Sequence, residues 1–170
     1  MRFALIALLI SAPLGAQTAA ELPGSACGPA ATSFKVKLNY ASPAPAERDP
    51  AKAQVYFIHD AGSVVNFSLA YPTTKIAIDS AWAGANHGDS WFSVELAPGE
   101  HHVCATLQSS LVNQRVELAH FTAQPGHAYY FRTRLVMSGQ VELLELEPLD
   151  SDQGAYLVRF YPMSVARAKK

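Results

Sequence analysis

Six histidines are the side chains of this 170-residue sequence best suited to chemistry, because neutral imidazole is a common ligand of zinc and copper. They are His59, His87, His101, His102, His120 and His127. His87 lies close to Asp89, and His102 directly follows His101. One interpretation is a metal-dependent hydrolase that draws its ligands from these four positions. Adjacent strand residues point to opposite faces, however, so the favoured interpretation is that His101 and His102 are polar strand residues beside a turn.

Two tryptophans supply a second candidate site. Trp91 belongs to an alternating segment, on the face opposite Phe92, and Trp82 lies in the turn-rich segment before it. Exposed tryptophans stack on sugar rings or anchor partner proteins, so Trp82 and Trp91 predict, as an alternative, a carbohydrate-binding module. The other interpretation is that both rings cover the end of the core.

Motifs that would assign a reaction are absent from the sequence. It contains no Gly-x-Ser-x-Gly elbow, no phosphate-binding glycine loop, no dinucleotide fingerprint and no His-Glu-x-x-His. Catalytic triads are recognised by geometry, so this absence weakens the expectation of an enzyme without removing it. The sequence favours a non-enzymatic protein with no catalytic residue, no cofactor and no bound metal.

The first twenty residues have the pattern of a secretory signal peptide. Arg2 precedes the apolar run Phe3–Ile10, and small residues follow up to Ala20. The run is well short of the ~20 residues that span a bilayer, so residues 1–20 predict export to the periplasm or the exterior. Cleavage is expected between about residues 16 and 20, and the mature chain is expected to carry no transmembrane segment.

Cys27 and Cys104 are the only cysteines. An isolated pair in an oxidising compartment usually forms a disulfide, which is the favoured prediction. Free buried thiols remain an alternative. Lipid attachment at Cys27 is a further one, but the leucine that precedes a lipidated cysteine is missing.

Composition excludes two classes of protein. Hydrophobic residues make up 49%, charged residues 16%, and the net charge is -1. An intrinsically disordered chain would be less apolar and more charged. A protein held to nucleic acid or anionic lipid by its overall charge would carry a basic excess. The length predicts one ordinary domain.

Short alternating or β-branched segments recur from Phe34 onward. Strands are expected at 34–40, 54–59, 64–69, 75–79, 91–96, 101–107, 115–123, 127–136 and 141–147, with a short last strand at 158–161. Turn residues separate these segments every 8–12 residues or so, which predicts an all-β, antiparallel sandwich of seven to nine strands. Asp150 and Gln153 resemble a capping box and predict one short C-terminal helix that ends near Leu157.

Four segments are expected along the chain. They are a signal peptide at 1–20, a lead with an edge strand and a Pro-rich loop at 21–52, the sandwich domain at 53–164 and a basic, frayed tail at 165–170.

Two local features are expected within the domain. Pro98 and Gly99 predict a type II turn that joins two strands in a hairpin. Arg132 and Arg134 are expected to form surface ion pairs with the acidic strand that follows, which contains Glu142, Glu145 and Glu147.

Four segments of the chain carry a family resemblance. They are Ala53–Phe57, Ile76–Asp79, Ala97–Cys104 and His127–Arg132. Together they resemble a small exported bacterial family whose domain has no established function, and they are similar to the PEGA-type modules of envelope proteins. The resemblance implies an immunoglobulin-like or transthyretin-like β-sandwich without an established activity. It gives Pro98, Gly99 and His101 a structural role in the turn and its flanking strand.

The function predicted from these features is binding or scaffolding in the cell envelope by an exported, non-enzymatic β-sandwich. The expected partner is an envelope protein or glycan, and not a nucleic acid. The hydrolase and the carbohydrate-binding module are the alternatives.

Overall fold

The computed structural model describes residues 27–41, 49–60, 72–108, 116–138 and 141–169. The expected signal peptide and the expected strand at 64–69 lie outside the described residues. The described elements are β1 (Phe34–Asn39), β2 (Ala53–His59), β3 (Thr73–Ile78), β4 (Ala81–His87), β5 (Ser90–Leu96), β6 (Gly99–Leu107), β7 (Val116–Ala123), β8 (Ala128–Ser138), β9 (Val141–Leu149), α1 (Ser151–Phe160) and β10 (Met163–Ala168). No helix in these described ranges is long and apolar enough to cross a membrane.

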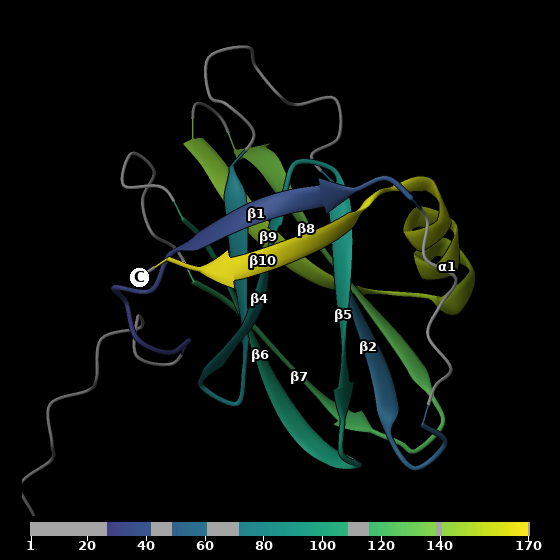
Figure 1. Cartoon of the computed structure of the whole chain (residues 1–170). Coiled ribbons are helices and arrows are strands. Elements are labelled where there is room, and N and C mark those ends of the chain that lie inside the picture. Colours follow the sequence, from purple (N-terminus) through teal and green to yellow (C-terminus); the bar gives the residue numbers. More distant parts are fainter. Residues whose placement is uncertain (1–26, 42–48, 61–71, 109–115, 139–140, 170) are drawn as a thin grey trace, which may run out of the picture.

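The strands form two sheets packed against each other (Figure 1). The six-stranded sheet has the order β1-β10-β5-β2-β8-β9, and the four-stranded sheet has the order β4-β3-β6-β7. The all-β prediction with one short helix is confirmed. Six of the eight described strand pairings are antiparallel, as predicted, whereas β2 pairs in parallel with β8 and β10 with β5. The described residues form ten strands. β4 occupies a segment expected to hold turns around a short strand, and most of β10 lies in the segment expected as a tail.

Alternation along β2 decides which side chains enter the core. Val55 and Phe57 point between the sheets, into a cluster that includes Ile76 and Val103 of the four-stranded sheet. Tyr56 and Ile58 of the same strand point outward and pack beneath α1. A strand buried on both faces reads as a continuous apolar run, which explains the sequence of β2.

The helix α1 covers part of the outer face of the six-stranded sheet. Asp150 caps its first turn by accepting hydrogen bonds from the N–H groups of Asp152 and Gln153. Gly154 lies against the ring of Tyr130, where a Cβ atom would clash. The helix continues to Phe160, which corrects the expected end near Leu157 and the expected strand at 158–161. The extra turn brings Val158 onto the apolar surface beneath the helix.

The strands β1 and β10 close one side of the sandwich (Figure 1). β10 joins the six-stranded sheet through one residue pair, Met163 with Trp91, and then pairs along its length with β1. The side-chain amide of Gln108, just after β6, accepts from the Phe34 N–H and donates to the Phe34 carbonyl at 2.9 Å. This contact ties β1 to the four-stranded sheet. Residues 165–168, expected in a frayed tail, therefore belong to a paired strand.

The Pro98–Gly99 segment connects the sheets instead of closing a hairpin. β5 belongs to the six-stranded sheet and β6 to the four-stranded sheet, so the two strands are not paired, which corrects the hairpin prediction. Gly99 has a φ of 140°, the positive value for which the sequence predicts a glycine there.

Candidate functional site

Trp91 is buried beneath the helix. Its side chain is 6% exposed, its Nε1–H donates to the carbonyl of Tyr161 at 2.9 Å, and its ring lies 5.8 Å from that of Tyr56. A sugar ring needs an exposed aromatic face. Trp91 is placed instead as part of the packing that holds α1.

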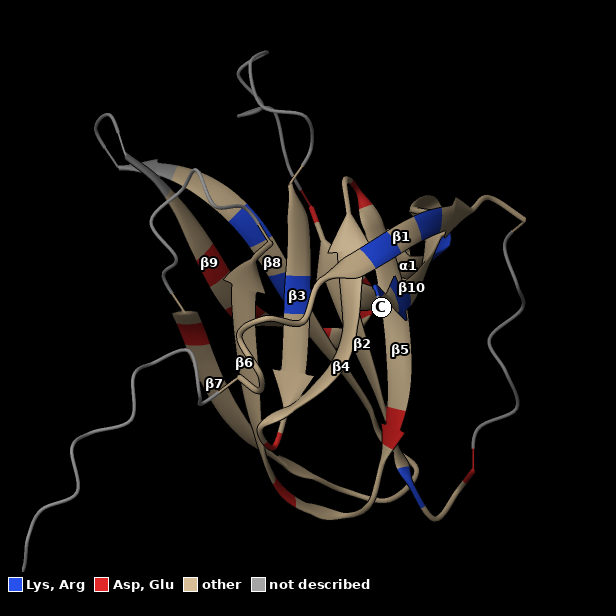
Figure 2. Cartoon of the chain, turned by 60° about the vertical axis from the view of Figure 1, so that its left-hand side comes forward, with Lys and Arg blue, Asp and Glu red and all other residues tan. Residues whose placement is uncertain are grey.

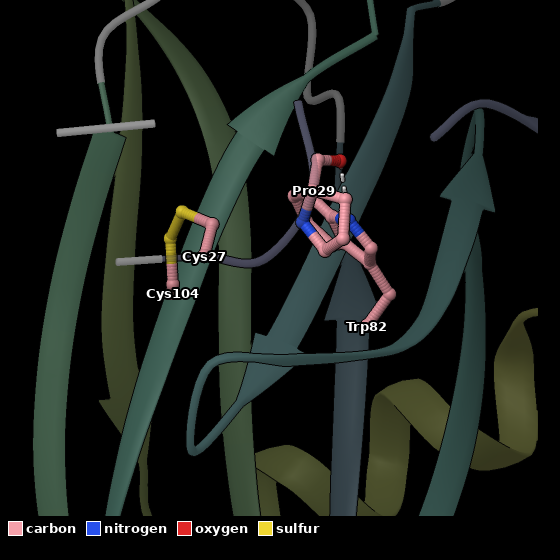
Figure 3. The surroundings of a disulfide bond; sticks show 4 residues. All are labelled: Cys27, Pro29, Trp82 and Cys104. Carbon is pink, nitrogen blue, oxygen red and sulfur yellow. Dashed lines mark hydrogen bonds between the residues drawn. A yellow bond between two sulfur atoms is a disulfide. The ribbon is translucent and has the colours of Figure 1, made fainter. Parts of the chain in front are cut away.

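Trp82 lies on the outer side of the other sheet and holds the segment 27–33 (Figure 3). Its Nε1–H donates to the carbonyl of Pro29 at 3.0 Å, and the ring of Phe34 meets it edge-on. The Nζ of Lys75 sits 4.3 Å from the centre of the Trp82 ring. The structure thus places Trp82 and Trp91 on opposite sheets, and it does not bring them together as a sugar platform.

The N-terminal segment 27–33 is anchored by its first residue as well. Cys27 and Cys104 form a disulfide with a Cα–Cα distance of 5.3 Å, so the predicted juxtaposition of the cysteines is confirmed (Figure 3). Lys75 donates to the carbonyl of Thr32 at 3.0 Å, and burial lowers the pKa of Lys75. The segment therefore covers part of the outer face of the four-stranded sheet.

His101 and His102 point to opposite faces of β6, as expected for adjacent strand residues. The Nδ1 of His101 lies 2.7 Å from Asp79 Oδ2, and its Nε2 lies 2.9 Å from the carbonyl of Ala97. Burial opposes the charged form of this ring, but the hydrogen bonds with Ala97 and Asp79 outweigh it and raise the pKa of His101. His102 is exposed on the outer face, next to His120.

His87 lies far from His101. Its Nδ1 contacts the hydroxyl of Thr73, the first residue of β3, whereas His101 contacts Asp79, just beyond the last residue of that strand. Six residues of strand separate the two ends by roughly 20 Å. Across the part of the chain that the structure describes, no group of three or more His, Cys, Asp or Glu residues is arranged to hold a metal ion. The histidine cluster of the hydrolase interpretation is not brought together.

His59 is a buried polar residue that the sequence interpretation did not single out. It is 0% exposed, and its Nδ1 lies 3.0 Å from the Thr133 hydroxyl and 3.3 Å from the Thr74 hydroxyl. Burial lowers the pKa of His59 to about 4, so the ring is neutral near pH 7. A histidine at the end of an apolar strand carries no sequence signal that distinguishes this environment from an exposed one.

The outer face of the β1–β10 pair carries three exposed cations, Lys35, Lys37 and Arg167, here called the basic face. Together with Val165 they line one pocket. Lys35 stands directly opposite Arg167, and Lys37 opposite Val165. Figure 2 shows the Lys and Arg segments of β1 in blue. Like charges opposite each other in a sheet are destabilising. Among described side chains, none forms an ion pair with these three cations.

Arginines elsewhere in the same sheet are neutralised. The Nε atoms of Arg132 and Arg134 donate to Glu147 at 2.8 Å and to Glu145 at 2.6 Å, which confirms these predicted cross-strand pairs. The side chain of Glu142 is not described. The contrast separates the three cations of the basic face, which have no carboxylate partner among the described side chains, from these paired arginines. The signal of the basic face was present in the alternating lysines of 34–40, but the partner strand could not be identified without the fold.

Comparison with protein-family models, with curated proteins and with solved structures finds no match.

Proposed function

We propose that this protein is an exported, non-enzymatic binding module of the cell envelope, and that the basic face is its binding surface. The signal-peptide pattern of residues 1–20 supports export, and the Cys27–Cys104 disulfide suits an oxidising compartment. The four segments that resemble PEGA-type modules support an immunoglobulin-like or transthyretin-like type for the sandwich.

The observation that carries the proposal is the pairing of Lys35 with Arg167. Two cations held opposite each other cost stability unless an anion lies between or above them. The neighbouring arginines Arg132 and Arg134 have carboxylate partners, so the sheet elsewhere avoids this cost. An external anion would offset it on the basic face.

The spacing of the charges favours a linear anionic glycan as the partner. Lys35 and Lys37 lie on the same face of one strand, two residues or about 7 Å apart along it. Such a row meets successive phosphate or carboxylate groups of an extended polymer. The chain as a whole has a net charge of -1, so the attraction is local to this face.

Binding of poly(glycerol phosphate) and of polygalacturonate, with neutral dextran as the uncharged polymer, tests the proposal. We expect the unmodified protein to bind at least one anionic polymer and not dextran, and Lys35→Glu to weaken that binding by about tenfold. Lys52→Glu is the matched control, because Lys52 is an exposed lysine at a distance from β1 that already pairs with Glu95 at 3.1 Å. Equal loss in the two variants, or no binding by the unmodified protein, contradicts the proposal.

A further inference from the structure

The outer face of the four-stranded sheet also carries, on β6 and β7, two histidines side by side. His102 of β6 is paired directly with His120 of β7, and both side chains are exposed. Their ring centres are 6.4 Å apart, and the rings are tilted by 39°. The shallow pocket at this place is lined by His102, Leu118 and Asp79, among others.

The backbone holds the two histidines close. The N–H of His102 donates to Asp79 Oδ1, and its carbonyl accepts from the Asp79 N–H, each at 2.9 Å. Both backbone groups of His102 therefore point away from β7. The pair with His120 is then a non-hydrogen-bonded one, the type in which Cα atoms are nearest, at about 4.5 Å, and side chains lie closer.

We infer that His102 and His120 form a two-histidine site for one divalent transition-metal ion. Two imidazole nitrogens bind such an ion at about 2.0–2.1 Å, which with a tetrahedral angle sets the ring centres roughly 5 Å apart. Rotation of two exposed side chains about χ1 and χ2 covers the difference from 6.4 Å. Water fills the remaining positions, which distinguishes this site from one closed by three or four protein ligands.

The donor set selects the class of ion. Imidazole suits copper, zinc and nickel, whereas magnesium and calcium prefer oxygen ligands. With the same two ligands, Cu²⁺ binds more tightly than Zn²⁺. The nearby carboxylate of Asp79 adds negative charge beside His102, which favours a cation there. The two cysteines of this face are joined in a disulfide and supply no thiolate.

The test is a Cu²⁺ titration of the unmodified chain and of His102→Gln, His120→Gln and His127→Gln, followed by calorimetry and electron paramagnetic resonance. His127 is the matched control, an exposed histidine whose Nδ1 contacts the Pro125 carbonyl beyond the end of β7. We expect a site with two imidazole nitrogens, weakened by at least about tenfold in each of the first two variants and unchanged in the third.

A second measurement separates loss of the site from loss of the fold. An ion that binds the folded chain raises its melting temperature, so Zn²⁺ should raise it for the unmodified chain and for His127→Gln. Neither Mg²⁺ on the unmodified chain nor Zn²⁺ on His102→Gln should have this effect. Unchanged Cu²⁺ affinity in both His102→Gln and His120→Gln, or a spectrum without imidazole nitrogen, overturns the inference. The basic face lies on the other sheet, so this result is independent of the proposed function.

Discussion

The two outer faces of the sandwich are each partly covered, but by different means. On the six-stranded sheet the cover is α1, which is held by apolar side chains such as Leu157, Tyr130 and Trp91. On the four-stranded sheet the cover is segment 27–33, which is held by a disulfide and by side chains that bond its carbonyls. A segment of small residues has little apolar area to bury, so a covalent bond and hydrogen bonds replace the hydrophobic contact.

The exposed parts of the two outer faces differ as well. On the sheet that α1 covers, the exposed surface carries a lysine and an arginine without an ion-pair partner among the described side chains. On the other sheet it carries His102 and His120. A sandwich can therefore present two chemically distinct surfaces when the apolar side chains of each outer face are covered. Altering one face at a time shows how independent the two faces are.

Removing the disulfide is expected to have the largest effect. The Cys27→Ser/Cys104→Ser variant opens a loop of 77 residues, which the chain-entropy model equates with about 4–5 kcal/mol of stability. Denaturant unfolding of the variant and of the reduced protein measures the loss. Hydrogen exchange should show the four-stranded face deprotected more than α1. A loss below about 1 kcal/mol would contradict a structural role for the bond.

Acid is expected to lower the stability of the whole fold, because His59 is buried between the two sheets. The unfolded chain takes up a proton at His59 near pH 6.5, whereas the folded chain resists it until about pH 4. Stability therefore falls as the pH drops through this window, by about 3 kcal/mol. His101 acts in the opposite sense, since its raised pKa favours the folded state at low pH. Titration of the His59 ring by NMR near pH 6.5 in the folded protein would refute the prediction.

Truncating the helix contact tests the apolar cover. Leu157→Ala is expected to cost about 2–3 kcal/mol, because Leu157 is buried at 9% exposure between α1 and the sheet. Gln153→Ala, at an exposed position of the same helix, is the control and should change stability little. Exchange protection should fall in α1 and remain in segment 27–33. Equal deprotection of both covers would show that they are coupled.

Removing one hydrogen bond tests how segment 27–33 is held, with a smaller expected effect than removing the disulfide. Trp82→Phe deletes the N–H that donates to Pro29 and is expected to cost about 1 kcal/mol. Thermal unfolding gives the magnitude, and faster exchange in segment 27–33 gives the location. No local change in exchange would mean that the disulfide alone holds the segment.

The smallest stability change is expected on the basic face, with the opposite sign. Lys35→Glu places a carboxylate opposite Arg167 and should stabilise the fold by about 0.2–1 kcal/mol. Binding to the anionic polymer should weaken in the same variant. A variant that is less stable than the unmodified protein would mean that the two cations already have a stabilising environment.

The strand pattern was predictable because alternation and turn residues are local signals. Local signals of this kind predicted most strand positions, the helix cap at Asp150 and the ion pairs of Arg132 and Arg134. Connections between strands that depend on partners far away in the sequence were not predictable from local signals. The Pro98–Gly99 segment has the chemistry of a hairpin turn, but β5 and β6 each find a better partner elsewhere.

The candidate sites show the same limit. The sequence indicates that Trp82 and Trp91 could bind a ligand. The burial of Trp91 under α1 and the contact of Trp82 with Pro29 depend on tertiary structure. The pairing of His102 with His120, and of Lys35 with Arg167, joins segments 18 and about 130 residues apart. Nothing in either segment alone specifies its partner.

The salt dependence of polymer binding tests the central claim most directly. Each cation that contacts a polyanion adds to the slope of log affinity against log salt concentration. The Lys35→Gln/Arg167→Gln variant should lower the magnitude of that slope by about one to two, while Lys52→Gln leaves it unchanged. An unchanged slope in the double variant would show that the polymer binds elsewhere and that the basic face is not the binding surface.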